Sequence, residues 1–224
     1  IIFYLKKNLT LKWKSENILS INILRESWPI IIISVASIIN TRIDQVYIGS
    51  MLSSSVLGNF SAAAKVAEFW LVLPVIIHTV LYPILIDLRS INFNKYKRLI
   101  YLIISASFLF GVLFSGLITS FSKEIILILF GNKYNIAGEY LALYIWSTLP
   151  IFSLYIVGSV IYLENLIKKN LIVSGVSILA NLILNYFFIQ FYGANGAIYA
   201  TLLVTLISYS LIGYFIYNHT KLLR

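Results

Sequence analysis

Long apolar runs alternate with short polar segments along the whole chain. A membrane-spanning helix needs about 20 mostly apolar residues at about 1.5 Å each. Six runs meet this length, at roughly residues 28–48, 57–85, 99–121, 140–163, 171–191 and 197–217. Continuous runs predict helices, because the strands of membrane barrels alternate polar and apolar positions over about ten residues. We therefore predict an all-α, polytopic membrane bundle of six transmembrane helices, which satisfy their own backbone groups in lipid.

Prolines and short amphipathic stretches modify this pattern. Because proline removes a backbone donor, Pro74 and Pro83 predict kinks in the second span and Pro150 in the fourth. The segment SKEIILILFGNKYNIAGE, residues 122–139, predicts a short interfacial helix ended by Gly131. Residues 8–26 predict a basic amphipathic stretch lying on the membrane surface. Its apolar anchors are Trp13, Ile18, Leu19 and Ile23.

Composition agrees with a membrane protein. Of 224 residues, 60% are hydrophobic and only 11% are charged, whereas soluble domains carry about 25% charged residues. The mean hydropathy is +0.91. The chain has no cysteine, which excludes disulfides and thiolate metal sites, and its two histidines are too few for a His-based metal cluster. We predict neither a metal nor another cofactor.

The net charge of +9 is explained by basic residues in the loops rather than by a surface that binds nucleic acid. The segments before the first span and after the second, fourth and sixth carry 13 of the 17 Lys and Arg residues, whereas the alternate segments carry only Lys123 and Lys133. Basic residues accumulate in cytoplasmic loops. We therefore predict a multi-pass protein with both ends of this chain in the cytoplasm and no nucleic-acid partner.

The chain opens with IIFYLKK, which reads like the end of an apolar helix. We expect the chain to be the C-terminal part of a longer membrane protein. In this interpretation residues 1–26 form a cytoplasmic linker and interfacial helix after a preceding lobe. Residues 27–218 form the six-helix transmembrane lobe, and residues 219–224 form a cytoplasmic tail.

Four charges interrupt the first two spans: Arg42, Asp44, Lys65 and Glu68. A charge at the bilayer centre costs about 2.5–3.5 kcal/mol on insertion scales, so such residues usually face a water-filled cavity or pair together. Asn40 and Asp44 share a helix face at four-residue spacing, and Lys65 and Glu68 do so at three. The two spans form a hairpin, in which an Asp44–Lys65 or an Arg42–Glu68 contact is feasible. The charges either line one polar site or lock the hairpin.

Plainer roles remain open for these residues. The Arg42 side chain can extend to the outer interface, and Lys65 and Glu68 can simply neutralise each other. Asn181 and Asn185 lie four apart in the fifth span. For this pair a hydrogen bond to another helix is favoured over lining a cavity.

Enzyme signatures are missing from the sequence. It contains no Gly-rich phosphate loop, Walker sequence, nucleophile elbow or metal-ligand spacing. We therefore predict that the chain is not an enzyme.

Four stretches, taken in order, carry a family resemblance. They are IDQVYIGSMLSSSVLGNFSAAAKVAEFW, LPVIIHTVLYPILID, LFGNKYNIAGEYL and NLIVSGVSILANLILNYFFIQFYGANGAIYATLLV. In order and spacing they resemble the C-terminal half of the bacterial O-antigen flippases (Wzx type). These belong to a polysaccharide-exporter branch of the superfamily that also contains the multidrug-extruding MATE transporters. The resemblance covers nearly all of residues 25–217.

The resemblance implies a two-lobe transporter in the bacterial inner membrane, of which this chain is the C-terminal lobe. The implied activity is to move undecaprenyl-diphosphate-linked O-antigen or other polysaccharide repeat units from the cytoplasmic to the periplasmic leaflet. By the same resemblance, Arg42 and Lys65 would contact the head group. Asp44 and Glu68 would be their partners or ion-coupling sites, and Asn40 would belong to the same cavity. The implied partners are lipid-linked oligosaccharide, membrane lipid, the N-terminal lobe and polysaccharide polymerase machinery.

Three other classes of protein remain as alternatives. A multidrug/cation antiporter on the same fold would favour an acidic excess in its cavity, whereas the intramembrane charges here are balanced. A membrane polysaccharide polymerase or glycosyltransferase would carry large outer loops with acidic or arginine-rich motifs, which this chain lacks. A structural membrane subunit without a substrate would not need intramembrane charges.

Overall fold

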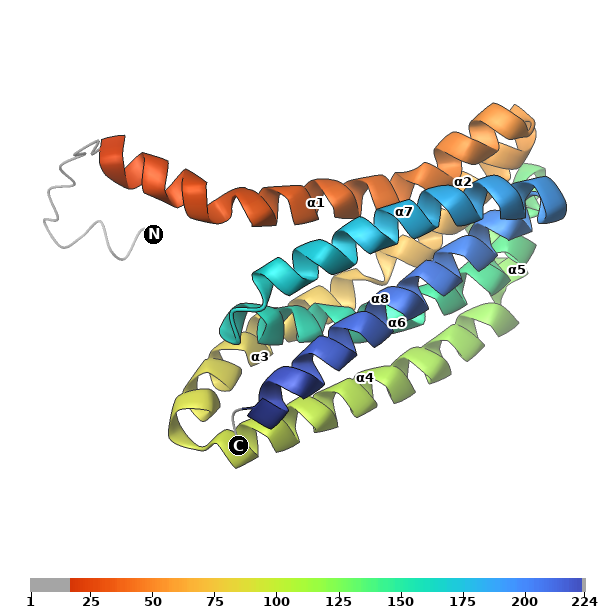
Figure 1. Cartoon of the computed structure of the whole chain (residues 1–224). Helices are drawn as coiled ribbons and strands as arrows, with labels where there is room; N and C mark the ends of the chain where they lie inside the picture. Colours follow the sequence, from red (N-terminus) through yellow and green to blue (C-terminus); the bar gives the residue numbers. More distant parts are fainter. Residues whose placement is uncertain (1–16, 223–224) are drawn as a thin grey trace, which may run out of the picture.

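The computed structural model describes residues 17–222, which fold into a bundle of long helices (Figure 1). The helices are α1 (Asn17–Met51), α2 (Ser54–Phe69), α3 (Val72–Ile91), α4 (Phe93–Ser120), α5 (Ser122–Phe130), α6 (Ala137–Leu163), α7 (Ile167–Tyr192) and α8 (Ala194–Leu222). A 3₁₀ turn, Asn132–Tyr134, follows α5. Six stretches are long and apolar enough to cross a membrane: Ser27–Met51, Ser54–Ile91, Phe93–Ser120, Ala137–Leu163, Ile167–Tyr192 and Ala194–His219. The predicted all-α, six-span class is confirmed.

The second span is broken into α2 and α3 just before Pro74. Because Pro74 has no N–H, the carbonyl of Trp70 instead accepts from the N–H of Leu73 at 3.1 Å. The N–H of Leu71 likewise turns back to the carbonyl of Glu68 at 3.0 Å. The predicted interruption is therefore a break between two helices, whereas α3 continues through Pro83 and α6 through Pro150.

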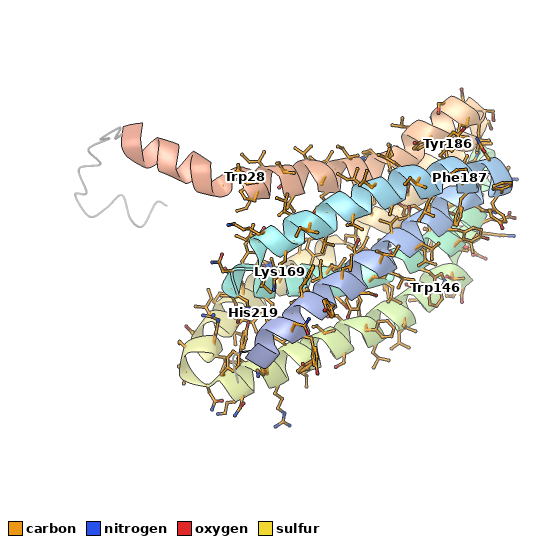
Figure 2. All side chains as sticks on the ribbon, viewed as in Figure 1. Trp28, Trp146, Lys169, Tyr186, Phe187 and His219 are labelled. Atoms are coloured by element: carbon orange, nitrogen blue, oxygen red, sulfur yellow. The ribbon has the colours of Figure 1, made fainter. Side chains whose placement is uncertain are left out.

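The helix α6 lies in the middle of the bundle, in contact with α2, α3, α4, α5 and α8. Around it, α7 packs between α1 and α8 (Figure 1). Apolar side chains also cover the outer faces. Trp28, Tyr186 and Phe187 point away from the bundle (Figure 2), and each is about half exposed. Such faces suit contact with lipid tails.

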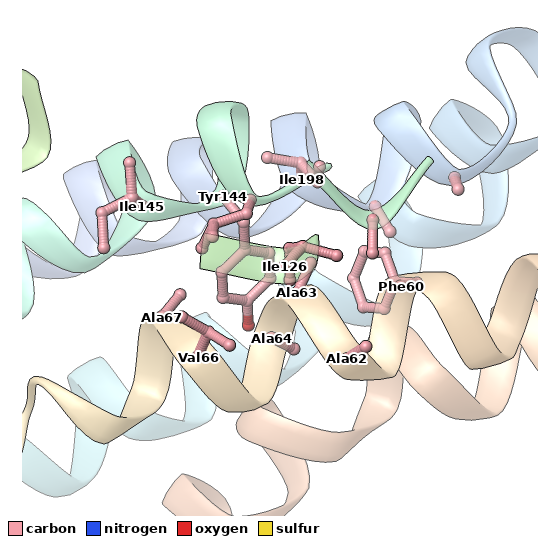
Figure 3. Packing of buried hydrophobic residues seen from close by; sticks show 14 of the residues in the cluster. Phe60, Ala62, Ala63, Ala64, Val66, Ala67, Ile126, Tyr144, Ile145 and Ile198 are labelled. Atoms are coloured by element: carbon pink, nitrogen blue, oxygen red, sulfur yellow. The ribbon is translucent and has the colours of Figure 1, made fainter. Parts of the chain in front are cut away.

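Small residues let α2 approach α6 closely. Ala62, Ala63, Ala64 and Ala67 are all at most 4% exposed, and small residues at helix interfaces permit near contact of the backbones. The Tyr144 ring of α6 lies over these alanines (Figure 3) and meets the Phe60 ring edge-on, with centroids 5.6 Å apart. The half of the bundle near α5 thus has a dry, closely packed core.

Two glycines define turns at the same end of the bundle. Gly131 ends α5 with φ +77°, a backbone conformation that favours glycine, which confirms the predicted helix end. At the α7–α8 turn, a Cβ on Gly196 would lie 2.0 Å from the carbonyl oxygen of Phe188. Only glycine permits this close approach.

Several predicted boundaries differ from the helix ends. Residues 8–16 of the expected surface stretch, with Trp13, lie outside the described residues. Residues 17–26 continue directly into the first span as part of α1, and α8 continues through residue 222. The division into linker, lobe and tail stays a prediction.

Candidate functional site

A carboxylate is buried between three helices in the middle of the bundle. The Asp44 residue of α1 is 1% exposed. Its Oδ1 accepts a hydrogen bond from Asn185 Nδ2 of α7 at 2.9 Å, and its Oδ2 accepts one from Thr201 Oγ1 of α8 at 2.5 Å. We call Asp44, Asn185 and Thr201 the carboxylate cluster. Hydrogen bonds to a charged group typically contribute about 1.5–3 kcal/mol each.

One polar atom of the carboxylate cluster has no partner. The Nδ2 of Asn185 donates to Asp44 Oδ1, to the Asn181 carbonyl at 3.1 Å and to Asn181 Oδ1 at 2.7 Å. All three neighbours are acceptors, so the orientation of the amide is fixed. Its other atom, Oδ1, is buried without a hydrogen-bond partner. An unpaired buried oxygen is costly, so a donor or a cation at Asn185 Oδ1 would be favourable.

A cavity of about 370 Å³ lies next to the carboxylate cluster, between α1, α2, α6, α7 and α8. Asn181 Nδ2 donates to the Asn40 carbonyl at 3.2 Å and to Asn40 Oδ1 at 3.0 Å, and both residues line the cavity together with Thr201. Hydroxyl side chains supply much of the remaining lining: Ser147, Thr148, Ser174, Ser177, Thr205 and Ser208. Apolar side chains such as Ile33, Leu154 and Val204 form the rest of the wall. A partly polar cavity therefore lies inside a bundle whose outside is apolar.

The other intramembrane charges lie on the open face of α1 and α2. Arg42 Nη2 is 3.3 Å from Glu68 Oε2, and the two side chains are 54% and 24% exposed. Glu68 also lines the cavity. Lys65 is exposed and makes no ion pair within residues 17–222. This face carries two cations at about mid-helix depth.

Of the two contacts predicted between the charges of α1 and α2, one forms. The Arg42–Glu68 contact is confirmed, whereas Asp44 contacts Asn185 and Thr201 rather than Lys65. Glu68 is paired with Arg42, so mutual neutralisation of Lys65 and Glu68 is not what the structure shows. The helices α1 and α2 also extend further than expected, which shortens their connection to Leu52 and Ser53.

The asparagine prediction holds, but it is incomplete. Asn181 and Asn185 do bond another helix, α1. Asn181 also lines the cavity, so the two roles offered as alternatives coincide. Asn40 and Asp44 face α7 together, as their four-residue spacing predicted, while Arg42 points away toward α2.

A second polar cluster joins four helices at the opposite end of the bundle from α5. Glu164, at the end of α6, has a fully buried carboxylate. It accepts from Arg89 Nε and Nη2 of α3 at 2.9 and 3.2 Å and from Tyr96 OH of α4 at 3.0 Å. His219 Nε2 of α8, labelled in Figure 2, lies 3.3 Å away. We call Glu164, Arg89, Tyr96 and His219 the Glu164 cluster.

Electrostatics favour the charged form of Glu164. Burial alone would raise the pKa of the carboxyl, but the hydrogen bonds from Arg89 and Tyr96 and the nearby positive charge outweigh burial and lower it below the usual 4.5. The cluster is therefore a structural ion pair that ties together the ends of α3, α4, α6 and α8.

Sequence reasoning missed the Glu164 cluster and the hydroxyls of α7 and α8. A helical-spacing test would have found the hydroxyls, because polar residues recur three or four apart on each span. These polar residues are Ser174, Ser177, Asn181 and Asn185 on α7, and Thr201, Thr205 and Ser208 on α8. The signal for Glu164 was weaker, an isolated acid at the end of an apolar span.

Side chains of the types that hold metal ions do not gather in the part of the chain that the structure describes. No group of three or more His, Cys, Asp or Glu side chains there is arranged to hold a metal ion. The oxygens around Asp44 are a different donor set, because carboxylate, amide and hydroxyl oxygens suit hard cations and protons rather than zinc or copper.

These features define a class: a multi-pass helical membrane protein with a partly polar cavity inside the bundle and charges on one open face. Residues 1–89 match a family model described as polysaccharide biosynthesis protein. The match covers α1, α2, α3 as far as residue 89 and all four intramembrane charges, about two-fifths of the chain. No curated protein matches the chain, and no solved structure does.

Proposed function

We propose that this chain is one lobe of a transporter that flips lipid-linked polysaccharide repeat units across the bacterial inner membrane, from the cytoplasmic to the periplasmic leaflet. The substrate head would be an undecaprenyl-diphosphate-linked oligosaccharide. The match of residues 1–89 to polysaccharide biosynthesis proteins supports the substrate class. The proposed binding of the head group rests on the charged face of α1 and α2.

The depth of this face in the membrane is the main support for its role in binding the head group. Arg42 lies nine residues before the end of α1 and Lys65 eleven after the start of α2, or about 14 and 16 Å along the helices. Both lie near the middle of a hydrocarbon layer about 30 Å thick. Exposing cations to lipid there is unfavourable, so this face is best satisfied by a water-filled cavity shared with a second lobe. A diphosphate is the complementary ligand.

The carboxylate cluster would couple a cation to transport. Asp44 and the unpaired Asn185 Oδ1 offer oxygen ligands in a buried position, and binding there joins α1, α7 and α8. A bound cation that favours one packing of these helices shifts the population of that conformation. Glu68, paired with Arg42 across α1 and α2, would adjust the charge of the head-group face.

The test uses the full-length protein in a bacterial strain lacking its own flippase. Arg42→Ala, Lys65→Ala and Asp44→Asn are scored singly for surface polymer at matched membrane levels, with the exposed Lys133→Ala as control. We expect each of the first three to reduce surface polymer at least tenfold while the lipid-linked repeat accumulates inside. Normal polymer in both cation variants would refute the head-group role.

A cation-coupled multidrug antiporter is the second candidate, because Asp44 and Glu68 lie in or beside the cavity. It predicts that the same strain gains resistance to cationic drugs and gains no surface polymer. Resistance lost in Glu68→Gln, with polymer never restored, would favour the antiporter over the flippase.

A further inference from the structure

The residues one turn beyond the carboxylate cluster differ on its two sides. Toward the α5 end, four residues along each helix, the neighbours are apolar and at most 2% exposed. They are Ile48 on α1, Ile189 on α7 and Ala197 on α8. All three belong to one continuous hydrophobic cluster with Phe60 and Ile198. We call Ile48, Ile189 and Ala197 the apolar layer. It separates Asp44 from the α5 end of the bundle.

Toward the other end, the same step reaches polar residues. Four residues from Asp44, Asn185 and Thr201 lie Asn40, Asn181 and Thr205, and all three line the cavity. The carboxylate cluster therefore sits at a boundary, with a dry layer on one side and a polar cavity on the other.

The cavity continues from this boundary toward the α6–α7 turn. Its lining runs from Asn181 to Asn170 on α7 and from Thr201 to Ile212 on α8. Each stretch advances eleven positions, about 16 Å at 1.5 Å per residue. Polar side chains recur along both stretches, so water in the cavity would find partners throughout its length.

Several hydroxyls of the lining present oxygen acceptors to the cavity. Thr148, Ser174 and Thr205 each donate their hydroxyl proton to a carbonyl of their own helix, at 2.6, 3.0 and 2.9 Å. Their lone pairs remain available to the cavity. Glu68 also lines the cavity, and its Oε1, the oxygen that Arg42 does not contact, is buried without a hydrogen-bond partner, so this wall favours a small cation and its water.

We propose that this cavity is the route by which a small monovalent cation, a proton or an alkali ion, exchanges between Asp44 and the α6–α7 end, and that the apolar layer closes the route toward the α5 end. The Lys and Arg distribution assigns the α6–α7 end to the cytoplasm. The inference rests on the proposed coupling role of Asp44 and adds the side of the membrane to which the ion has access in this conformation.

Introduced cysteines test the route directly, because the chain has none of its own. In the full-length protein, with any cysteine elsewhere replaced, Ser208→Cys and Thr205→Cys place a thiol in the cavity and Ala197→Cys places one in the apolar layer. The matched control Ser210→Cys lies on the exposed face of the same helix, where lipid suppresses thiolate formation. Ser90→Cys and Asn132→Cys, both exposed, report the two membrane surfaces.

A small, membrane-impermeant cationic thiol reagent is applied without substrate to vesicles of each orientation. We expect Ser208→Cys and Thr205→Cys to react at least tenfold faster from the side that labels Ser90→Cys than from the side that labels Asn132→Cys. Ala197→Cys and Ser210→Cys should react slowly from both. Cavity thiols labelled faster from the Asn132 side, or unlabelled from either side, overturn the proposal.

Competition distinguishes the ion and separates this inference from the proposed function. Sodium chloride in place of choline chloride should slow labelling of Thr205→Cys at least threefold if the ion is Na⁺. If sodium has no effect, and acidification slows the labelling of Thr205→Cys more than it slows the labelling of Ser90→Cys, the ion is a proton. Slowing by neither overturns cation access to the cavity. Because labelling needs no transport, one-sided labelling together with normal polymer in Asp44→Asn would reject the coupling role and keep the route.

Discussion

Replacing Arg89 by methionine removes the guanidinium that donates two hydrogen bonds to the buried carboxylate of Glu164. Methionine keeps most of the apolar stem, so packing changes little. What remains around the carboxylate is the hydroxyl of Tyr96 and the imidazole of His219. The variant therefore isolates the cost of leaving a buried negative charge without its main partner.

The magnitude follows from the exposure of the two partners. Breaking a fully buried pair by removing one member costs about 3–5 kcal/mol. The Glu164 side chain is 0% exposed but that of Arg89 is 43% exposed, so solvent already screens part of the interaction. We expect a loss of about 2–3 kcal/mol, which for a chain of this size lowers the unfolding temperature by about 4–12 °C.

A second substitution tests whether the loss of stability comes from the unpaired charge of Glu164. If the cost comes from an unpaired buried charge, then adding Glu164→Gln to Arg89→Met should recover about 1 kcal/mol rather than add to the loss. The assay is thermal unfolding of the purified full-length protein in detergent, with the exposed Arg98→Met as matched control. If the double variant is less stable than Arg89→Met, or Arg98→Met costs as much, the Glu164 cluster does not work as described.

The pH dependence of the same pair has a defined sign. The folded-state pKa of Glu164 lies below its usual value of 4.5, so the unfolded chain binds this proton more readily. The stabilisation is complete above about pH 4.5 and is lost as the pH falls through the lower, folded-state pKa. We expect wild type to lose its advantage over Glu164→Gln only in this acidic window, and a loss between pH 6 and 8 instead would contradict the assignment.

Three further substitutions test other parts of the structure. Gly196→Ala should destabilise by at least about 1–3 kcal/mol in a thermal-unfolding assay, since its Cβ would meet the Phe188 carbonyl at 2.0 Å; Gly213→Ala, which meets nothing within 4 Å, should be neutral or stabilising. Asn185→Leu should cost about 1–3 kcal/mol by leaving Asp44 short of a donor, and unchanged stability would contradict the cluster. Pro74→Ala restores a backbone donor, so hydrogen exchange at residues 70–74 should slow, and no change would contradict the account of the break.

The spans and the hairpin contact were readable from the sequence for simple reasons. Apolar run length reports the hydrocarbon thickness directly, but helices continue into polar residues, so α8 begins before and ends after its apolar run. The Arg42–Glu68 pair was one of two feasible contacts. Which one forms depends on the rotation of α1, and this is set by Asn181 and Asn185, 141 residues away from their partners.

The cavity and the Glu164 cluster needed the tertiary structure. A hydroxyl in a membrane helix costs little wherever it points, since it can bond its own backbone. The helical spacing of Ser208 marks a polar stripe on α8, but it does not show that Ser208 and Thr148 share one cavity. Arg89 and Glu164 lie 75 residues apart, and each alone reads as an ordinary charge at the end of a span.

The break between α2 and α3 bears on how this lobe can change shape. Bending a continuous helix in lipid would expose carbonyls that nothing in the hydrocarbon can satisfy. At Trp70 and Leu71 the ladder is already interrupted, and local turns bind the freed groups. A pivot of α3 about this joint would leave every other backbone hydrogen bond of the span intact. Side-chain packing of α3 on α4 and α6 and the ion pair between Arg89 and Glu164 would resist this pivot, so the stiffness of this joint resides in side chains rather than in the backbone.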